Sequence, residues 1–362
     1  MTNDYAVTVV IPVHQLNRPI ERAVGSALAA GHPGQVKVLV VCHGLAAQDV
    51  QAQLSDLPQP DIEFLEFVDG IPSPAGPKNA GLGQVATRYV AFLDSDDYLE
   101  GDALSTWIDQ ADASQADAVV ARLRTQSGAV VRSPRLRLLR RGPLNPVRDR
   151  VAYRTSPFGV MRRSTVERLG MQFTTGLRTG EDMEFSLRMW FGGGRIEMGR
   201  PDAVYVVGED AVERVTAPML PLREEFRALS HVLRVAWLEE LTNPSRHAIG
   251  VKILRVHILS AMYRRGGGFP WSTDDRAALA AAVEAIKTIA PSVEQPLSIA
   301  ELELLRLAEA PQSSPEAFAD ALKMWPSGGY RTQILTPRLR DNLRLESNFR
   351  YYGAEKIVSI LR

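Results

Sequence analysis

The sequence is poor in the features that mark secreted and membrane-spanning proteins. It has one cysteine, Cys42, so no internal disulfide can form, which is compatible with a reducing compartment. No apolar run approaches the roughly 20 residues needed to cross a bilayer. The opening Met-Thr-Asn-Asp-Tyr lacks the basic and apolar parts of a secretion signal. We therefore expect a cytoplasmic protein, either free or at the inner face of a membrane.

The sequence also lacks a net charge and an internal repeat. Its 42 basic and 42 acidic residues cancel, so no overall field attracts nucleic acid, and we expect no nucleic-acid partner. Hydrophobic residues make up 45% of the chain and charged residues 23%, which is typical of a globular protein with a real core. A length of 362 residues suits about two domains.

The first half of the chain alternates strand and helix patterns. Residues 7–11 are β-branched and continuously apolar, which is typical of a strand buried on both faces, and Pro12 is expected to end it. Residues 20–28 carry apolar side chains at helical spacing. Two further strands are expected at 36–41 and 62–67. This order predicts an α/β fold with a doubly wound, mostly parallel sheet.

A fourth apolar strand, at 90–93, leads directly into a group of carboxylates. Asp94, Asp96 and Asp97, with Ser95 among them, stand at the carboxyl end of the strand, where open α/β sheets bind their ligands. Carboxylates this close repel one another, so a positive group should lie among them. A divalent cation held by one or two carboxylates and substrate phosphates fits this pattern. A solvated turn is the alternative, because Asp and Ser also favour turns and helix starts.

Two other polar motifs stand at the starts of predicted helices. A lysine in Lys78-Asn79-Ala80-Gly81 could hold an anion there, or could simply be a surface residue near the helix start. Glu181 and Asp182 open a later helix, where acids complement the helix dipole. Acids held rigidly at such a position would also suit a general base.

Residues 132–154 are strongly basic, with eight arginines against one acid, Asp149. Three prolines indicate that much of this stretch is loop. A solvated, mobile loop is one interpretation. The other is a cradle for a phosphate-bearing substrate, because guanidinium groups match phosphate oxygens, and Arg140 and Arg141 are then our candidates for acceptor binding. Tyr153 is the one aromatic residue in the stretch, which weakens a nucleic-acid interpretation.

The pattern changes near residue 218. We expect a boundary there between a nucleotide-sugar-binding catalytic domain, residues 1–217, and a helical domain, residues 218–362. The helix that contains Lys252 and Arg255 is apolar on one side and basic on the other, and a packed helix with a solvated basic face is favoured over a membrane-surface helix. Long helices are predicted at 222–241, 248–263, 273–289 and 299–310.

In their order along the chain, these motifs resemble those of family 2 glycosyltransferases, which have the GT-A fold. The likeness covers roughly residues 7–210. It rests on Ile11-Pro12-Val13-His14, Lys78-Asn79-Ala80-Gly81, Phe92-Leu93-Asp94-Ser95-Asp96-Asp97 and Thr179-Gly180-Glu181-Asp182. The resemblance implies inverting transfer of a sugar from a nucleotide-diphosphate donor, with a UDP-sugar favoured. It also implies a Mn²⁺ or Mg²⁺ cofactor and a glycan or phosphate-bearing acceptor, such as a cell-envelope polymer.

The resemblance further implies roles for individual residues. Asp96 would bind the metal, and Asp182 would be the catalytic base, with Glu181 beside it binding or orienting the acceptor. Lys78 takes the place of a family arginine near the diphosphate, and His14 takes a position often filled by tyrosine. The donor-binding residues would be Pro12, His14, His43, Lys78, Asp94 and Ser95.

Two positions depart from the family pattern. The second strand of such enzymes usually ends in aspartates that read the nucleotide base, and here those places hold Cys42 and His43. This puts uridine recognition in doubt, although His43 could still bond a base edge. After the last strand a histidine often joins the metal shell, and here Glu209 and Asp210 stand instead. A carboxylate is a competent ligand for a hard cation, so Asp210 is our candidate second ligand.

Two other functions stay open. A nucleotidyltransferase could use a similar sheet, whereas a dehydrogenase would need a Gly-x-Gly-x-x-Gly turn that the residues after the first strand lack. A non-catalytic nucleotide-sugar-binding protein is the second, favoured by Cys42-His43 and opposed by Asp94, Asp96 and Asp182. The helical domain could bind the acceptor, form a homo-oligomer or dock at a membrane, and the sequence does not decide among these.

Overall fold

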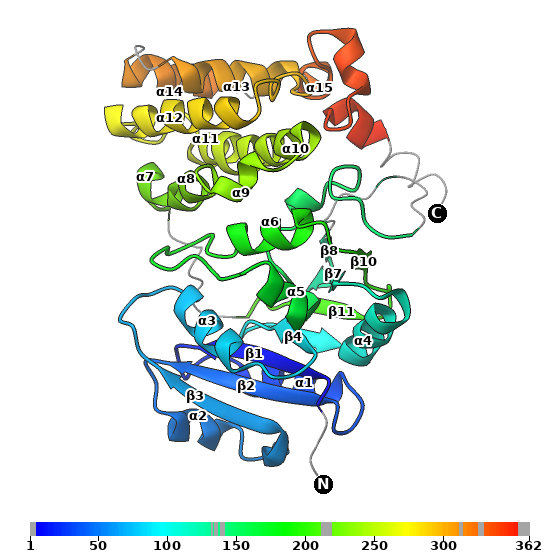
Figure 1. Cartoon of the computed structure of the whole chain (residues 1–362). Coiled ribbons are helices and arrows are strands. Elements are labelled where there is room, and N and C mark those ends of the chain that lie inside the picture. The colour runs from blue at the N-terminus through cyan, green and yellow to red at the C-terminus, as the bar shows by residue number, and fades with distance from the viewer. Residues whose placement is uncertain are drawn as a thin grey trace. The chain divides into compact units, whose positions relative to one another are not determined.

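A computed structural model describes residues 5–131, 133, 137, 142–210, 219–310, 314–324 and 329–353. The chain forms two compact units, which Figure 1 shows in blue to green and in yellow-green to red. The first comprises Met1–Arg135 and Arg141–Ala217, and the second comprises Leu136–Arg140 and Pro218–Arg362. Strands and helices alternate in the first unit, whereas the described part of the second is helical, so the predicted α/β fold with a helical C-terminal region is confirmed.

The first unit is built on a seven-stranded sheet with the order β10-β6-β9-β4-β1-β2-β3. Every neighbouring pair in it is parallel except those made by β9, which runs antiparallel between β4 and β6. These strands are β1 (Val7–Val13), β2 (Val36–His43), β3 (Ile62–Phe67), β4 (Tyr89–Phe92), β6 (Ala118–Val120), β9 (Gly159–Arg162) and β10 (Ile196–Met198). A second sheet has the order β5-β11-β7-β8, formed by β5 (Tyr98–Glu100), β11 (Val204–Val207), β7 (Arg122–Thr125) and β8 (Val130–Val131).

Six helices and two short 3₁₀ turns complete the described part of this unit. The helices are α1 (Ile20–Ala29), α2 (Ala47–Gln53), α3 (Ala75–Gln84), α4 (Ala103–Ser114), α5 (Arg163–Arg168) and α6 (Met183–Phe191), and the turns are η1 (Gln59–Asp61) and η2 (Val151–Tyr153).

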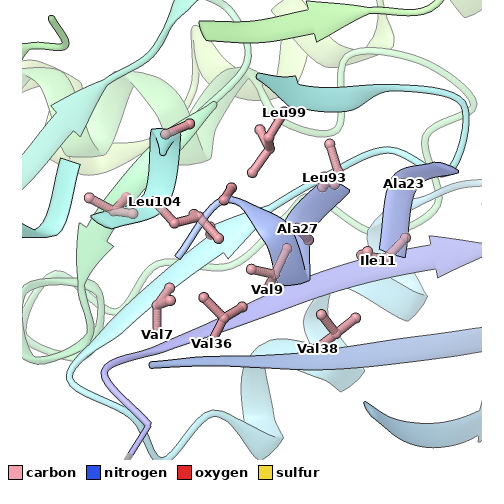
Figure 2. Packing of buried hydrophobic residues seen from close by; sticks show 14 of the residues in the cluster. Val7, Val9, Ile11, Ala23, Ala27, Val36, Val38, Leu93, Leu99 and Leu104 are labelled. Carbon is pink, nitrogen blue, oxygen red and sulfur yellow. The ribbon is translucent and has the colours of Figure 1, made fainter. Parts of the chain in front are cut away.

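The core lies on both faces of β1, which explains its continuous apolar sequence. Figure 2 shows Val7, Val9 and Ile11 on one face, in a cluster with residues of β2 and α1. On the other face, a Cβ added to Gly81 of α3 would lie 2.4 Å from Cγ1 of Val10, so the helix packs directly on the strand. Each fully buried valine contributes about 1.5–3 kcal/mol to stability.

Two features of the sheet differ from the sequence prediction. Pro12 does not end β1 but lies within it, opposite Val41 of β2. The strand on the other side, β4, stops at Phe92 opposite Val10, so Pro12 has one strand neighbour and its missing N–H is tolerated as at an edge. The other difference is that the sequence does not predict β9 and β10, because strands of four and three residues are too short to show a pattern.

The second unit consists of short and long helices in the part of the chain that the structure describes. They are α7 (Leu222–Glu225), α8 (Arg227–Val232), α9 (Ala236–Glu239), α10 (Asn243–Ile253), the π-helical turn η3 (Leu254–Leu259), α11 (Ser260–Arg265), α12 (Thr273–Ile289), α13 (Ile299–Glu309), α14 (Pro315–Met324), α15 (Tyr330–Ile334) and the 3₁₀ turn η5 (Leu339–Leu343). The helix predicted at 222–241 is therefore broken into three. Among the described residues, no helix has both the length and the apolar character needed to cross a membrane.

The basic helix of this unit is packed, as predicted, but the prediction of a solvated basic face holds only in part. Arg264 is exposed, whereas Lys252 and Arg255 lie inside. Lys252 is buried, with its Nζ 2.8 Å from Nε2 of His257. Arg255 pairs with Glu301, Nε to Oε1 at 2.8 Å. Lys252 and Arg255, which the sequence pattern assigns to solvent, find their partners inside the helical unit. This helix therefore offers little basic surface to a membrane.

Candidate active site

A single lysine joins the carboxylates after β4 to the acidic pair before α6. Lys78 is the fourth residue of α3 and is buried, so the surface-residue alternative is wrong. Its Nζ lies 3.2 Å from Oδ1 of Asp94 and 3.4 Å from Oε1 of Glu181. Burial lowers the pKa of Lys78, but the carboxylates of Asp94, Glu181 and Asp182 outweigh it and raise that pKa above its ordinary value. Lys78 is therefore a fixed positive charge at the centre of the site.

Glu181 is almost fully enclosed next to this lysine. Burial raises the pKa of its carboxyl to about 7, Lys78 opposes the shift, and the negative charges of Asp182 and Asp94 add to it. A carboxyl group that titrates near neutral pH can hold a proton or release it under ordinary conditions.

Asp182 stands at the N-cap position of α6 and is partly exposed. Its Oδ2 accepts a hydrogen bond of 2.7 Å from Oγ of Ser156. The same two segments are joined a second time, because Oγ of Ser186 in α6 donates to the carbonyl oxygen of Thr155 at 2.5 Å. The carboxylate is thus held in one orientation while part of it stays open to solvent, as a general base requires.

Asp96 lies on the opposite side of the acidic turn and is held by an arginine. Nη1 of Arg18 lies 2.7 Å from its Oδ2, and the arginine side chain is 7% exposed. The sequence predicts that a positive group lies among these carboxylates, and the structure supplies two side chains, Lys78 and Arg18. Because two largely buried cationic side chains pair with these carboxylates, the turn is not a simple solvated one.

Asp210 is bound by a second arginine, Arg22 of α1, four residues after the first. Both of its carboxylate oxygens accept hydrogen bonds from Arg22, at 2.5 and 2.9 Å. This contact lowers the pKa of Asp210 to about 2, so the group is ionised across the working range of the protein. Arg22 also donates to the carbonyl oxygen of Asp96 at 2.6 Å, which links the end of β11 to the acidic turn.

Asp97 is buried beneath the turn and serves to hold it. Its two oxygens accept hydrogen bonds from the hydroxyl of Tyr205 at 2.6 Å and from the amide of Gly208 at 2.8 Å. Burial raises its pKa to about 7, and the neighbouring Asp94 and Asp96 contribute to the shift. Gly208 must be glycine, because a Cβ there would lie 1.9 Å from the carbonyl oxygen of Asp96.

The predicted nucleoside-binding residues stand at the ends of two neighbouring strands. Pro12 and the exposed His14 lie at the end of β1, and His43 lies at the end of β2. Nε2 of His43 lies 2.8 Å from Oδ1 of Asp69, which follows β3. Cys42 is buried, and burial raises the pKa of its thiol to about 11, so it is an inert packing residue. The family pattern expects an acid at the end of β2. Here Asp69, after the neighbouring strand β3, supplies an acid at the same edge of the sheet.

The metal prediction can be tested against the side chains that are present. Within the described ranges, no group of three or more His, Cys, Asp or Glu side chains is gathered as a metal site. Mg²⁺ and similar cations are usually bound by one or two carboxylates together with substrate phosphates. Asp94, Ser95 and Asp96 sit together on one turn and fit that arrangement. Asp96 is paired with Arg18, as Asp210 is with Arg22.

Only part of the basic stretch can be placed. Arg140 and Arg141, the predicted acceptor-binding residues, lie outside the described residues. Arg150 and Arg154 are buried, so the solvated-loop interpretation is wrong for these two. Nη2 of Arg154 donates a hydrogen bond to the carbonyl oxygen of Ala121 at 2.6 Å, so Arg154 has a structural role inside the domain.

The sequence interpretation missed Arg18, Arg22, Asp69 and Ser156. The arginines carry a usable signal, because two basic residues four positions apart follow the first strand, near the edge where the acidic turn is expected. Asp69 and Ser156 lie in segments with no periodic pattern, and only the folded chain shows which side chains they contact.

Comparison with known proteins identifies the domain that contains this site. Residues 8–170 match the family model described as "Glycosyl transferase family 2". The chain carries a family 2 glycosyltransferase domain. The matched range contains the Lys78 motif and the acidic turn, so the resemblance seen in the sequence is confirmed.

Two curated relatives of this glycosyltransferase domain are glycan-related proteins. The chain is 30% identical over 227 residues to the succinoglycan biosynthesis protein ExoO of Rhizobium meliloti, covering 58% of this chain and 63% of that protein. It is 21% identical over 265 residues to the poly(ribitol-phosphate) beta-N-acetylglucosaminyltransferase TarS of Staphylococcus aureus (strain Mu50), covering 72% of this chain and 45% of that protein. The chain thus spans less than two thirds of the length of either relative.

The chain is also similar to solved structures. A crystal structure of S. aureus TarS 1-349 in complex with UDP-GlcNAc matches with a TM-score of 0.74 at 17% identity, covering 91% of this chain and 94% of that one. The same fragment in complex with UDP matches with a TM-score of 0.69 at 17% identity, covering 90% of this chain and 92% of that one. At this identity the likeness shows the fold alone, and it confirms the GT-A type predicted from the sequence.

Proposed function

We propose that this protein is an inverting glycosyltransferase that moves a sugar from a nucleotide-diphosphate donor to a hydroxyl group of a glycan or cell-envelope polymer. The observation that carries the proposal is the contact of one buried lysine, Lys78, with both Asp94 and Glu181. It brings the turn expected to hold the donor next to the pair expected to activate the acceptor, as a single displacement requires.

In the proposed mechanism, Asp182 removes the proton from the acceptor hydroxyl as its oxygen attacks the anomeric carbon. A new glycosidic bond forms, the bond from the sugar to the diphosphate breaks, and the electron pair leaves with the nucleoside diphosphate. Ser156 keeps the carboxylate of Asp182 in position. Lys78, which stays charged, supports the ionised carboxylates around the reacting groups.

Asp96 and Asp94 would hold Mn²⁺ or Mg²⁺ together with the donor phosphates. When bound, such a cation supplies Lewis-acid neutralisation of the departing diphosphate. The fit rests on oxygen ligands from a single turn, the kind that hard cations prefer. Arg18 lies against Asp96 and would face the same negative groups. Asp210 stays our second candidate ligand, and it would have to exchange Arg22 for the cation.

For the donor we propose a UDP-sugar, held by Pro12, His14, His43, Lys78, Asp94 and Ser95. The structurally similar TarS fragment is described in complex with UDP-GlcNAc and with UDP. For the acceptor we propose an anionic or phosphate-bearing polymer, because two relatives are named for poly(ribitol-phosphate) and because Arg140 and Arg141 lie in a basic stretch. Residues 1–217 would bind the donor, and residues 218–362 would bind the acceptor or form a homo-oligomer.

The test is a donor screen on the purified full chain with Mn²⁺ present, measuring release of nucleoside diphosphate and sugar transfer to polymer acceptors. We expect Asp96→Ala to lose metal-dependent donor binding. We expect Asp182→Asn to bind donor normally while transfer falls by at least about a thousandfold, because the base is gone. Binding without turnover across the panel would favour the non-catalytic alternative, and consumption of a nucleoside triphosphate would favour a nucleotidyltransferase.

A further inference from the structure

The last described segment of the second unit, residues 329–353, presents a one-sided charge to solvent. It follows α13 and α14 and appears in orange-red to red in Figure 1, starting with α15. Its two acids, Asp341 and Glu346, are both buried. Its five arginines are all exposed, namely Arg331, Arg338, Arg340, Arg344 and Arg350. Every charged side chain that this segment exposes is therefore positive.

The same segment exposes large apolar side chains. Leu339 and Leu343, at the two ends of the turn η5, are 80% and 73% exposed. Tyr330, Phe349 and Tyr352 are exposed as well. Between the leucines, the polar residues Asp341 and Asn342 are buried. This turn departs from the usual rule, because Asp341 and Asn342 face the protein while both leucines face water.

Hydrogen bonds within the segment fix this arrangement. The side-chain oxygen of Asn342, Oδ1, accepts a hydrogen bond from the backbone amide of Thr336 at 3.0 Å. The main-chain carbonyl oxygen of Asn342 accepts a hydrogen bond from Oγ of Ser347 at 2.5 Å. Nε of Arg344 donates to Oδ1 of Asp341 at 2.7 Å. The outward position of the leucines therefore follows from how the buried polar residues are satisfied, and it is not a frayed end.

We propose that the surface formed by Arg338, Leu339, Arg340, Leu343 and Arg350, called here the basic-apolar surface, binds an anionic lipid bilayer. Guanidinium groups pair with the phosphates of lipid headgroups, while leucine side chains enter the boundary of the acyl region. The inference takes up the sequence-based expectation of a location at the inner face of a membrane, and it holds whichever donor and acceptor the enzyme uses.

Two other occupants explain less of this surface. A soluble anionic polymer would account for the arginines but gives exposed leucines nothing apolar to bind. A second copy docked through the same patch would bury the leucines, but a two-fold contact sets each patch against itself. Arginines with no exposed acid in the segment would then repel one another. A bilayer with acidic headgroups satisfies both kinds of side chain.

The test is flotation of the full-length protein with vesicles of phosphatidylcholine alone or with 30% phosphatidylglycerol. We expect binding to the acidic vesicles only, weakened at high salt. An arginine near such a surface is worth about 1 kcal/mol, or about fivefold in affinity, so Arg338→Gln with Arg340→Gln should weaken binding about 25-fold. Leu339→Ser with Leu343→Ser should weaken it about tenfold or more through lost apolar burial.

The matched control is Arg200→Gln with Val130→Ser, which removes an exposed arginine and an exposed apolar residue from the first unit. It should bind like the unchanged protein, and all variants should keep their circular dichroism spectra. Equal binding to both vesicle types, or to neither, would overturn the proposal. So would retention of soluble polyphosphate without vesicle binding, or a dimer in solution that the leucine changes abolish. Donor turnover is scored separately, so loss of one function does not mimic loss of the other.

Discussion

Glu181 lies 3.4 Å from the Nζ of Lys78, a residue 103 positions earlier in the chain. The same nitrogen contacts Asp94, so one ammonium group balances the negative charge of carboxylates from both halves of the glycosyltransferase domain. Because Lys78 and Glu181 are both buried, the charge balance of the site is sensitive to the loss of either one. The following predictions use that sensitivity.

Removal of the lysine charge should destabilise the fold in a pH-dependent way. We expect Lys78→Met to lower the free energy of unfolding by about 3 kcal/mol at pH 8, because a buried partner is left unpaired. The loss should be smaller at pH 6, where Glu181, with a pKa near 7, already carries a proton. Urea unfolding at the two pH values measures this difference. Lys37→Met is the control, since Lys37 pairs with the exposed Glu63 and should change stability by no more than about 0.5 kcal/mol.

Arg18 should compete with a metal ion for Asp96. We expect Arg18→Gln to bind Mn²⁺ several-fold more tightly in the absence of donor, because the carboxylate no longer has to give up a guanidinium partner. Electron paramagnetic resonance of free Mn²⁺ reports this without any turnover. Arg88→Gln removes an ion pair with Asp112 and should leave Mn²⁺ binding unchanged. Weaker binding in Arg18→Gln would show that the arginine positions the carboxylate rather than blocking it.

Ser156 should act on the reaction through Asp182. Ser156→Ala removes the hydrogen bond that fixes the orientation of the Asp182 carboxylate. We expect kcat to fall about tenfold with little change in KM for the donor. Ser186→Ala, which loses a bond to the backbone of Thr155 only, should leave kcat nearly unchanged. A change in KM alone would contradict the positioning role.

Asp97 should make the fold less stable as the pH rises from 4 to 7. Its pKa is raised from 3.8 to about 7, so the folded state keeps a proton that the unfolded state releases, and the free energy of unfolding falls in this window. The expected contribution is on the order of 2–4 kcal/mol. Asp97→Asn should flatten the fall, as thermal unfolding at several pH values would show. Asp112→Asn, also bonded by a tyrosine but more exposed, should leave the slope unchanged.

The sequence predicts those parts of the molecule in which pattern and position agree. Buried parallel strands read as continuous apolar runs, so β1 to β4 could be placed, and a strand end rich in aspartate marks the ligand edge of the sheet. The partners of these acids could not be predicted in the same way. Lys78 looks like a surface residue in the sequence, because its burial depends on Asp94 and Glu181 arriving from elsewhere. The basic face of the helix at Arg255 misleads for the same reason, since its counter-group, Glu301, belongs to α13.

His43 and Asp69 touch across two neighbouring strands, and this has a consequence for how the family diverges. The acid that the family pattern places at the end of β2 is absent here, but Asp69, after β3, supplies a carboxylate beside His43. A comparison of single aligned positions would miss this carboxylate. The choice of nucleobase in such enzymes would then depend on all the side chains at the ends of β2 and β3, and not on one aligned position. Exchanging the turn that begins at Asp69 between relatives would be a compact route to a changed donor.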